Sequence, residues 1–422
     1  MPSRLRDRRP VHISQFSEDK MKLLFFVVLG TLIVSQTTAV LGAESTPQTL
    51  LLYTANTAAN TVSVVDVRKQ KLLQQIAVGA DPGGVLPNSN GKYVYITNKE
   101  SNSVSVIDTA TQKIIATLPV GTRPNHLYLS PDGKSVWVKN DRSAGVSVID
   151  ADQYKLIATI PTDNGHGKMA FTPDGKYVYI TNNRADTVTV IDIQAKKPIA
   201  TIAVGKSAHG ITYCSSGNKV YVANPGSNDV SVIDTKVNQV VRTLAVGSRS
   251  GYITCSPDGR YAYAANKGDH SVSVIDARED RVVVTIPVGK GPDHLMFTPD
   301  GKYAYVANTR SPDVSLLDIA RNRFVQAIQV GSAEPKKRGD QPQLVGATRG
   351  AGADRDPEAA QIHRSVALSP EGRLVFVPNP GDGTVSIIDH AKRKVLTTLA
   401  TGDGANNLAA FVPGQHAIHH AH

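Results

Sequence analysis

The sequence of 422 residues lacks the short motifs that mark common catalytic sites. It has no Gly-x-Ser-x-Gly elbow, Walker loop, His-Glu-x-x-His pair or Cys-x-x-Cys-His haem attachment, so nothing local signals catalysis. Aromatic residues make up only 5%, and no basic run is longer than Lys336-Lys337-Arg338. The net charge of +10 is scattered over turn segments, which is typical of a solvated surface, and we expect no nucleic-acid partner.

Cysteine is nearly absent, with only Cys214 and Cys255 in the whole chain. An exported protein is free to oxidise such a pair. The two cysteines are separated by 41 residues, one fewer than the repeat described below, which predicts that they point to opposite faces of equivalent strands. This offset favours two buried thiols that behave as small apolar residues over a disulfide bond.

Long apolar runs are also missing, apart from Leu23 to Val34 near the start. Lys22 precedes this run and small or polar residues follow it up to Ala43, a pattern that predicts a secretory signal peptide beginning at Met21 and cleaved after Ala39 or Ala43. A run of twelve residues is too short for a typical membrane span of about 20, although an uncleaved anchor is the alternative. We assign residues 1–43 to an upstream extension and signal peptide, and expect no membrane span after cleavage.

A repeat of 42 residues dominates the remaining sequence. Its markers are an aspartate after a short apolar run and an asparagine ten residues earlier. The aspartates are Asp66, Asp108, Asp150, Asp192, Asp234, Asp276, Asp318 and, after an insertion, Asp389; the asparagines are Asn56, Asn98, Asn140, Asn182, Asn224, Asn266, Asn308 and Asn379. A period of this length built from short β-rich runs predicts a β-propeller with one blade per repeat. Each aspartate belongs to a different blade, so we expect turn capping and no shared calcium ion.

Each repeat contains four strand-like runs. In five repeats a Ser/Thr-Pro-Asp-Gly turn joins the first two runs, as at Ser130 to Gly133, with Glu371 in place of the aspartate in one of them. The second run carries Tyr-Val-Tyr-Ile-Thr-Asn at Tyr93 to Asn98 and at Tyr177 to Asn182, and Tyr-Ala-Tyr-Val-Ala-Asn at Tyr303 to Asn308. This motif resembles the YVTN family of β-propeller repeats. That family is in turn similar to the quinoprotein amine dehydrogenase heavy subunit and to the haem-binding propeller of cytochrome-type nitrite reductases, so the resemblance implies fold more firmly than function.

Counting the strand-like runs predicts eight four-stranded antiparallel blades, an all-β fold, with seven blades as the alternative. Residues 44–414 form this single domain. The chain begins with a second-type strand at Leu50 to Asn56 and ends with an unpaired first-type strand at Asn407 to Val412. Pairing these two segments would complete an eighth blade and leave no open sheet edge.

The starts of the innermost strands should meet at one mouth of the propeller axis. The residues that we place there as cofactor or ligand contacts are His126, His166, His209, His294, His363, Lys168 and Tyr252. Histidine is suited to a metal, a haem iron, an anion or proton transfer. The first three histidines come from consecutive blades and form the best local group. The competing interpretation is that these histidines only build the turns between blades.

Two further segments interrupt the regular pattern. The insertion Ser332 to Ile362 has no strand or helix period and should emerge beside the histidine mouth as a lid, a partner contact or a loop without a role. The tail, residues 415–422, carries His416, His419, His420 and His422, which predict a second metal-binding segment on the opposite face, with a frayed end as the alternative.

We therefore expect an exported, periplasmic or extracellular monomer that binds a small ligand, a metal, a cofactor or a protein partner at its axial mouth. A transition metal or haem is the implied cofactor, and metal or redox physiology the implied setting. One alternative is a haem-type oxidoreductase or maturation protein. Another is an interaction module that uses the loops Asn98 to Asn102, Asn140 to Ala144 and Asn308 to Pro312.

Overall fold

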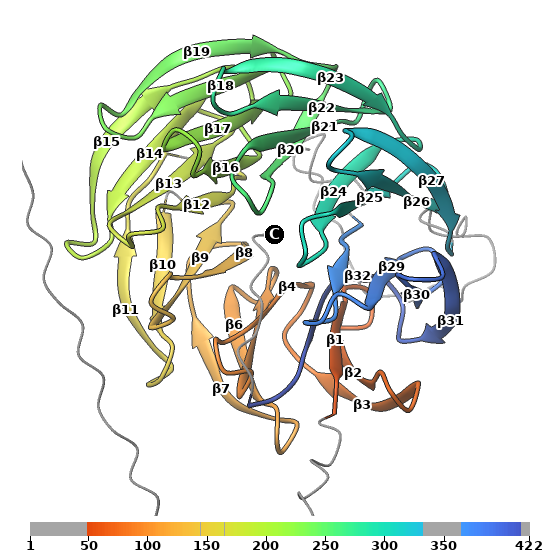
Figure 1. Ribbon diagram of the computed structural model, residues 1–422. Helices are drawn as coiled ribbons and strands as arrows, with labels where there is room; N and C mark the ends of the chain where they lie inside the picture. The colour runs from red at the N-terminus through yellow and green to blue at the C-terminus, as the bar shows by residue number, and fades with distance from the viewer. Residues whose placement is uncertain (1–48, 144, 164, 332–363, 415–422) are drawn as a thin grey trace, which may run out of the picture. The chain divides into compact units, whose positions relative to one another are not determined.

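The computed structural model describes residues 49–143, 145–163, 165–331 and 364–414, which form a ring of eight four-stranded antiparallel sheets (Figure 1). This confirms the predicted all-β propeller and its eight blades, and the seven-blade alternative is wrong. Within the described ranges, no helix is long and apolar enough to cross a membrane. The insertion Ser332 to Ile362, His363, the signal segment and the histidine-rich tail lie outside the described residues.

The four strands of each blade run from the axis outward. The innermost strands are β4 (Pro82–Pro87), β8 (Pro124–Leu129), β12 (Met169–Phe171), β16 (Ile211–Cys214), β20 (Ser250–Cys255), β24 (Pro292–Phe297), β28 (Ala367–Leu368) and β32 (Ala405–Phe411). The second strands are β1 (Leu51–Asn56), β5 (Tyr93–Asn98), β9 (Ser135–Asn140), β13 (Tyr177–Asn182), β17 (Lys219–Asn224), β21 (Tyr261–Asn266), β25 (Tyr303–Asn308) and β29 (Leu374–Asn379).

The outer half of each blade is equally regular. The third strands are β2 (Thr61–Asp66), β6 (Ser103–Asp108), β10 (Gly145–Asp150), β14 (Thr187–Asp192), β18 (Asp229–Asp234), β22 (Ser271–Asp276), β26 (Asp313–Asp318) and β30 (Thr384–Asp389). The outermost strands are β3 (Lys71–Ala77), β7 (Lys113–Pro119), β11 (Lys155–Ile160), β15 (Lys197–Ala203), β19 (Gln239–Ala245), β23 (Arg281–Pro287), β27 (Arg323–Gln329) and β31 (Lys394–Ala400). We number the blades 1 to 7 from β4–β7 to β28–β31, and blade 8 has the order β3-β2-β1-β32.

Blade 8 closes the ring, because it combines strands from both ends of the described chain. Leu51 is opposite Phe411 and Tyr53 is opposite Ala409 in the antiparallel pair of β1 and β32. In Figure 1 the two strands lie side by side although one is coloured red-orange and the other blue. The predicted shared blade is confirmed, and β32 covers the edge of β1 that would otherwise be unpaired.

The repeated aspartates cap turns, and the repeated asparagines connect the second and third strands of each blade. The side chain of Asp108 accepts a hydrogen bond of 2.8 Å from the Thr111 amide, and all eight aspartates make the same kind of bond two or three residues ahead. Turn capping is therefore confirmed. Asn98 Nδ2 donates to Ser103 and Ser105 of the next strand, at 3.1 and 2.9 Å. This bracing role of the asparagines was not predicted.

The blades are held together by side chains that cross from one sheet to the next. Six tyrosines of the second strands are fully buried, namely Tyr53, Tyr95, Tyr179, Tyr221, Tyr263 and Tyr305. Tyr95 of blade 1 donates its hydroxyl to the Ala151 carbonyl of blade 2 at 2.8 Å, so one residue both fills the interface and fixes the turn beyond it. A β-bulge in every pair of third and outermost strands, with a charged or polar residue where each outermost strand begins, protects the outer edges from pairing with other chains.

Cys214 and Cys255 form a disulfide bond between blades 4 and 5, with Cα atoms 5.6 Å apart. The prediction of two free thiols is wrong. The prediction assumed that residues on opposite faces cannot meet, which is true for two strands of one sheet. β16 and β20 instead belong to two stacked sheets. The face that blade 4 turns toward blade 5 is the opposite of the face that blade 5 turns back, so the offset of 41 residues directs both sulfur atoms into one interface.

Reduction of this disulfide is expected to lower the free energy of unfolding by about 2–4 kcal/mol, because the bond closes a loop of some 41 residues in the unfolded chain. Urea denaturation with and without dithiothreitol measures the change. The double variant Cys214→Ser/Cys255→Ser should match the reduced protein and ignore the reductant. Equal midpoints for oxidised and reduced protein would contradict the expectation.

Candidate functional site

The residues predicted for the axial mouth lie at the starts of the innermost strands, and the structure gathers them into two groups. We call His126, His166 and His209 the histidine cluster, and Lys168, Tyr252 and His294 the lysine cluster. His126 lies on β8 of blade 2, while His166 and His209 lie on the segments that lead into β12 and β16. The three histidines thus come from consecutive blades, as the sequence predicts, whereas the lysine cluster draws on blades 3, 5 and 6.

The histidine cluster brings three imidazoles to one point. One ligand nitrogen from each ring lies within 4.8 Å of the other two. His126 Nε2 and His166 Nε2 are 3.4 Å apart, and the rings of His166 and His209 stack with centroids separated by 4.7 Å. His209 is buried and the other two are partly buried. This is the only group of three metal-ligating side chains within that span among the described residues.

Hydrogen bonds orient two of the three rings. His166 Nδ1 lies 2.8 Å from Asp141 Oδ2, and Asn125 Nδ2 donates to the same oxygen at 3.0 Å. His209 Nδ1 lies 2.7 Å from the Gly251 carbonyl oxygen. Because carboxylate and carbonyl oxygens only accept, both Nδ1 atoms donate, and in a neutral imidazole this leaves Nε2 as the nitrogen that can bind a metal. Histidines that bind a metal usually donate their other ring nitrogen to an acceptor of this kind, which fixes the orientation of the ring.

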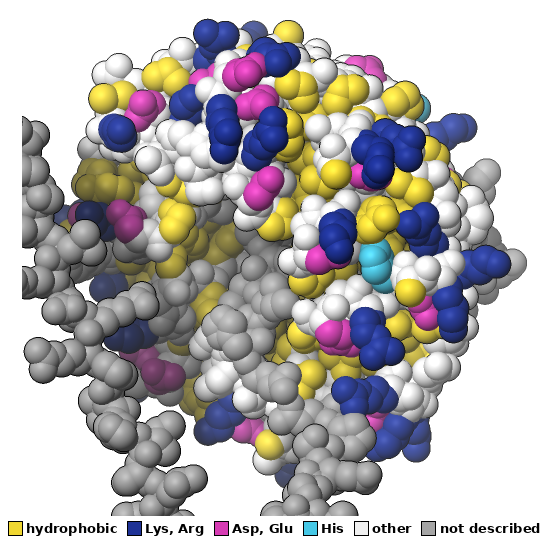
Figure 2. All heavy atoms as spheres, viewed as in Figure 1, with side chains coloured by type: hydrophobic (Ala, Val, Ile, Leu, Met, Phe, Trp, Pro, Cys, Tyr) yellow, Lys and Arg dark blue, Asp and Glu magenta, His cyan; other side chains and the backbone are white. Residues whose placement is uncertain are grey.

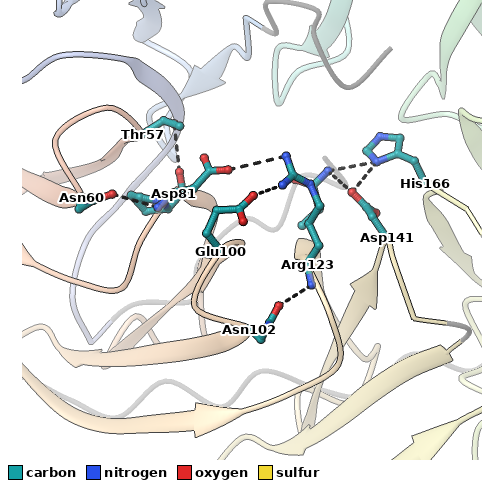
Figure 3. A network of polar contacts seen from close by, with 10 residues as sticks. Thr57, Asn60, Asp81, Glu100, Asn102, Arg123, Asp141 and His166 are labelled. Carbon is teal, nitrogen blue, oxygen red and sulfur yellow. Dashed lines mark hydrogen bonds and ion pairs between the residues drawn. The ribbon is translucent and has the colours of Figure 1, made fainter. Parts of the chain in front are cut away.

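A polar network continues from Asp141 along the mouth toward blade 8 (Figure 3). Arg123 forms ion pairs with Glu100 and with Asp81, the latter at 3.8 Å, and Asn102 Oδ1 accepts the Arg123 amide at 2.8 Å. Figure 3 shows Arg123 between these two acids and the pair formed by Asp141 and His166. The loops of blades 1 to 3 are therefore cross-linked where they surround the histidine cluster.

The lysine cluster reaches across the axis of the ring. Lys168 Nζ from blade 3 lies 3.3 Å from His294 Nε2 of blade 6 and 4.6 Å from the centroid of the Tyr252 ring of blade 5. His294 Nδ1 lies 3.4 Å from Asp293 Oδ2, and Lys267 lies 3.6 Å from the other oxygen of Asp293. Burial lowers the pKa of Lys168 to about 8, against the opposing influence of Asp293, and burial raises the pKa of Tyr252.

Several residues around the mouth were missed by the sequence analysis, namely Asn125, Lys139, Asp141, Lys267 and Asp293. A signal for them exists, because they break the repeat. Lys139 is fully buried where the equivalent residues are Thr97 and Thr181, and burial lowers its pKa to about 8. Asp141 directly follows the repeated Asn140, where blade 1 has Lys99. A comparison of the repeats at every position would have found them.

The opposite face carries its own hollows, built from hairpin turns. A cavity of about 510 Å³ is lined by Arg68, Asp300, Glu371, Arg373 and His390, among others. Burial lowers the pKa of His390, and its Nδ1 lies 2.7 Å from the Tyr305 hydroxyl. On the face in Figure 2, Lys and Arg side chains are interspersed with Asp and Glu side chains, so this surface has no single sign of charge.

Comparisons with known proteins agree on the fold. The cytochrome D1 haem domain family matches residues 50–168, and the seven-bladed β-propeller lactonase family matches residues 110–240 and 235–323. No curated protein matches the sequence. The resemblance to the YVTN family stays a prediction.

Three solved structures illustrate the range of similar proteins. Hydrazine synthase of Kuenenia stuttgartiensis is 25% identical, with a TM-score of 0.53 over 64% of this chain and 92% of that chain. The dihydro-haem d1 dehydrogenase NirN is 16% identical, with a TM-score of 0.66 over 85% and 74%. Apo AztD from Citrobacter koseri is 15% identical, with a TM-score of 0.63 over 86% and 98%. At these identities the last two show a shared fold alone.

Replacing Lys139 with Met is expected to raise the free energy of unfolding at pH 7 by about 1–3 kcal/mol, because burial disfavours the ammonium form. The folded pKa of about 8 lies below the ordinary value of 10.5. Unfolded lysine therefore holds a proton between pH 8 and 10.5 that folded lysine has lost, and the wild-type protein gains stability as the pH rises through this window.

The advantage of Lys139→Met should consequently shrink between pH 8 and 10.5, which urea denaturation at several pH values measures. Lys236→Met, at an exposed turn, is the control and should show no pH-dependent difference. A difference between Lys139→Met and wild type that stays constant with pH would contradict this explanation.

Proposed function

We propose that this β-propeller protein is exported and binds a transition-metal ion of the zinc class in the histidine cluster. One observation carries the proposal: three imidazoles from three blades place a ligand nitrogen each within 4.8 Å of one another. Tetrahedral zinc with Zn–N bonds of about 2.0–2.1 Å needs nitrogens about 3.3–3.4 Å apart. His126 Nε2 and His166 Nε2 are 3.4 Å apart, and His209 needs a shift of roughly an ångström.

The ligand set fits a borderline-soft divalent ion. Imidazole nitrogen is suited to zinc, copper and nickel, whereas calcium and magnesium prefer oxygen ligands. The bonds from His166 to Asp141 and from His209 to Gly251 hold both rings with Nε2 directed away from the supporting acceptor. Three protein ligands leave a coordination position open, which is typical of sites that exchange a ligand.

Three other features of the chain support a binding role outside the cytoplasm. The segment from Lys22 to Ala43 is typical of an export signal, and the sequence offers no nucleophile motif. A closed ring of eight blades supplies a rigid frame for three ligands from separate repeats. We therefore place the protein in metal or redox physiology of the periplasm or cell exterior, where it takes up or passes on the ion.

A second candidate is a haem-type cofactor, because the residues that match the cytochrome d1 haem domain, 50–168, include both His126 and His166. In this alternative one of these histidines would hold the haem iron. A Soret band in protein purified from its native compartment supports it. A colourless protein that leaves the spectrum of added haem unchanged would exclude the haem alternative.

Substitution of the histidine cluster is expected to weaken zinc binding by about 100-fold or more, since each imidazole supplies one of three bonds. The variants His126→Ser, His166→Ser and His209→Asn take the residues that other blades carry at Ser365, Ser250 and Asn125. Titration calorimetry should give one tight site in the parent protein and none in the variants. The four tail histidines are replaced by alanine throughout, because they offer ligands of their own.

His270→Asn serves as the matched control. His270 accepts the Gly291 amide at the position where Asn60 and Asn228 accept the Asp81 and Arg249 amides in other blades. This variant should bind zinc like the parent. Zinc binding that survives all three cluster variants would refute the proposed site.

Asp141→Asn is expected to lower zinc affinity by about 10–100-fold while the fold is retained, because an amide orients His166 but withdraws the negative charge that raises its basicity. Competition with a chromophoric chelator measures the change. The exposed Asp152→Asn is the control and should have no effect. An unchanged affinity in Asp141→Asn would show that the carboxylate does not support the metal.

A further inference from the structure

The region around the two clusters is unusually rich in buried charge. Lys139, Lys168 and Lys267 are all buried, with side chains near Asp141, Asp163 and Asp293. These three cations and three carboxylates balance one another before any metal is bound. The ion pairs of Arg123 with Asp81 and Glu100 lie further out, with side chains between 20% and 55% exposed, where water screens them.

Binding a divalent ion to three neutral imidazoles disturbs this balance. The site then carries two additional positive charges in a region with little water, which is costly unless a counter-charge enters with the metal. The open coordination position is a natural place for that counter-charge. The charge balance therefore calls for an anionic second ligand.

The backbone connects the lysine cluster to the histidine cluster, because Lys168 is two residues after His166. The His166 carbonyl accepts the Asn183 amide at 3.3 Å, and the Lys168 carbonyl accepts the Thr181 amide at 3.0 Å. The segment is thus extended and paired, so its alternate side chains, His166 and Lys168, project from the same side. A second link comes from blade 5, because the Gly251 carbonyl that holds His209 directly precedes Tyr252.

Lys168 is equipped to bind an anion there. Its ammonium has three N–H donors, and one of them is directed at His294 Nε2 at 3.3 Å. The Tyr252 ring lies under the charge at 4.6 Å and fixes its position by a cation–π contact. The Lys168 side chain is only 4% exposed, so an anion that reaches it leaves bulk water and interacts strongly.

We propose that the lysine cluster is an anion subsite, and that the protein takes up its metal together with a small carboxylate or oxyanion that contacts both the metal and the Lys168 ammonium. This inference rests on the proposed function of the histidine cluster. It explains why a lysine lies across the axis between blades 3 and 6 in a protein whose other blades carry Gly210, Ser365 or Asn407 at the same position. An organic carboxylate and an inorganic oxyanion share this chemistry.

The test uses cobalt as a spectroscopic substitute for zinc in the full-length chain with its four tail histidines replaced by alanine. Sodium acetate or sodium sulfate is titrated at constant ionic strength against perchlorate, which coordinates metals poorly. We expect a saturable change in the visible cobalt spectrum, and an increase of about tenfold or more in cobalt affinity at saturating anion. Acetate alone indicates an organic carboxylate as the natural ligand, whereas sulfate alone indicates an inorganic oxyanion.

Lys168→Met should bind cobalt in perchlorate within about threefold of the parent but lose the response to either anion. Tyr252→Phe should keep the response, because its ring remains. Lys236→Met, at an exposed turn, is the matched control and should respond like the parent. If Lys168→Met does not fold, Lys168→Asn replaces it, since blade 8 carries Asn407 at this position.

The outcomes separate the two proposals. Cobalt binding with no response to acetate or sulfate overturns the anion subsite and leaves the metal site standing. An anion response that persists in the Lys168 variant also overturns it, because the anion then binds elsewhere. Failure of cobalt to bind in any of the anions overturns the proposed function and the anion subsite together.

Discussion

β1 and β32 come from opposite ends of the described chain, and their backbone pairing joins both ends into one blade. Without this pairing, β1 would lose its inner partner strand, and Tyr53 would lose the stacked ring of Phe411. Closure also fixes the diameter of the ring, since eight sheets must meet around one axis. The separations within the mouth follow from that constraint: histidines on consecutive blades come within ligand distance, whereas blades 3 and 6, three positions apart in the ring, are connected by the long side chain of Lys168.

The positions that repeat and the positions that differ have separate tasks. Asn98 and Asp108 recur in every blade because each satisfies backbone or side-chain groups that every blade contains. The glycine that ends the outermost strand recurs for a similar reason: a Cβ atom on Gly79 would lie 2.7 Å from the Asn98 Cβ. Residues at the mouth are released from these demands, so the same position holds histidine, lysine, glycine or tyrosine in different blades. The residues with chemical function therefore lie at positions that the fold does not constrain.

This division decides how much the sequence alone can predict. The period of 42 residues, the turn residues and the two incomplete ends determine blade number and closure, because local turn chemistry and edge pairing act in every repeat. The disulfide was predicted wrongly because face alternation was applied within one sheet, while Cys214 and Cys255 meet between two sheets. The contact of Asp141 with His166 spans 25 residues and two blades, so the departure of Asp141 from the repeat can mark the residue but not its partner.

The same division bears on how a metal site can arise in a propeller without loss of the fold. Each histidine of the cluster occupies a position where another blade carries Ser365, Ser250 or Asn125, so the frame tolerates small polar residues there. The rings are held by acceptors from adjacent blades, Asp141 and the Gly251 carbonyl, and not by the hydrogen bonds that build the sheets. Binding strength and folding stability are therefore set by different residues. A ring of near-identical repeats can gain or lose such a site by changes at a few positions of three neighbouring blades.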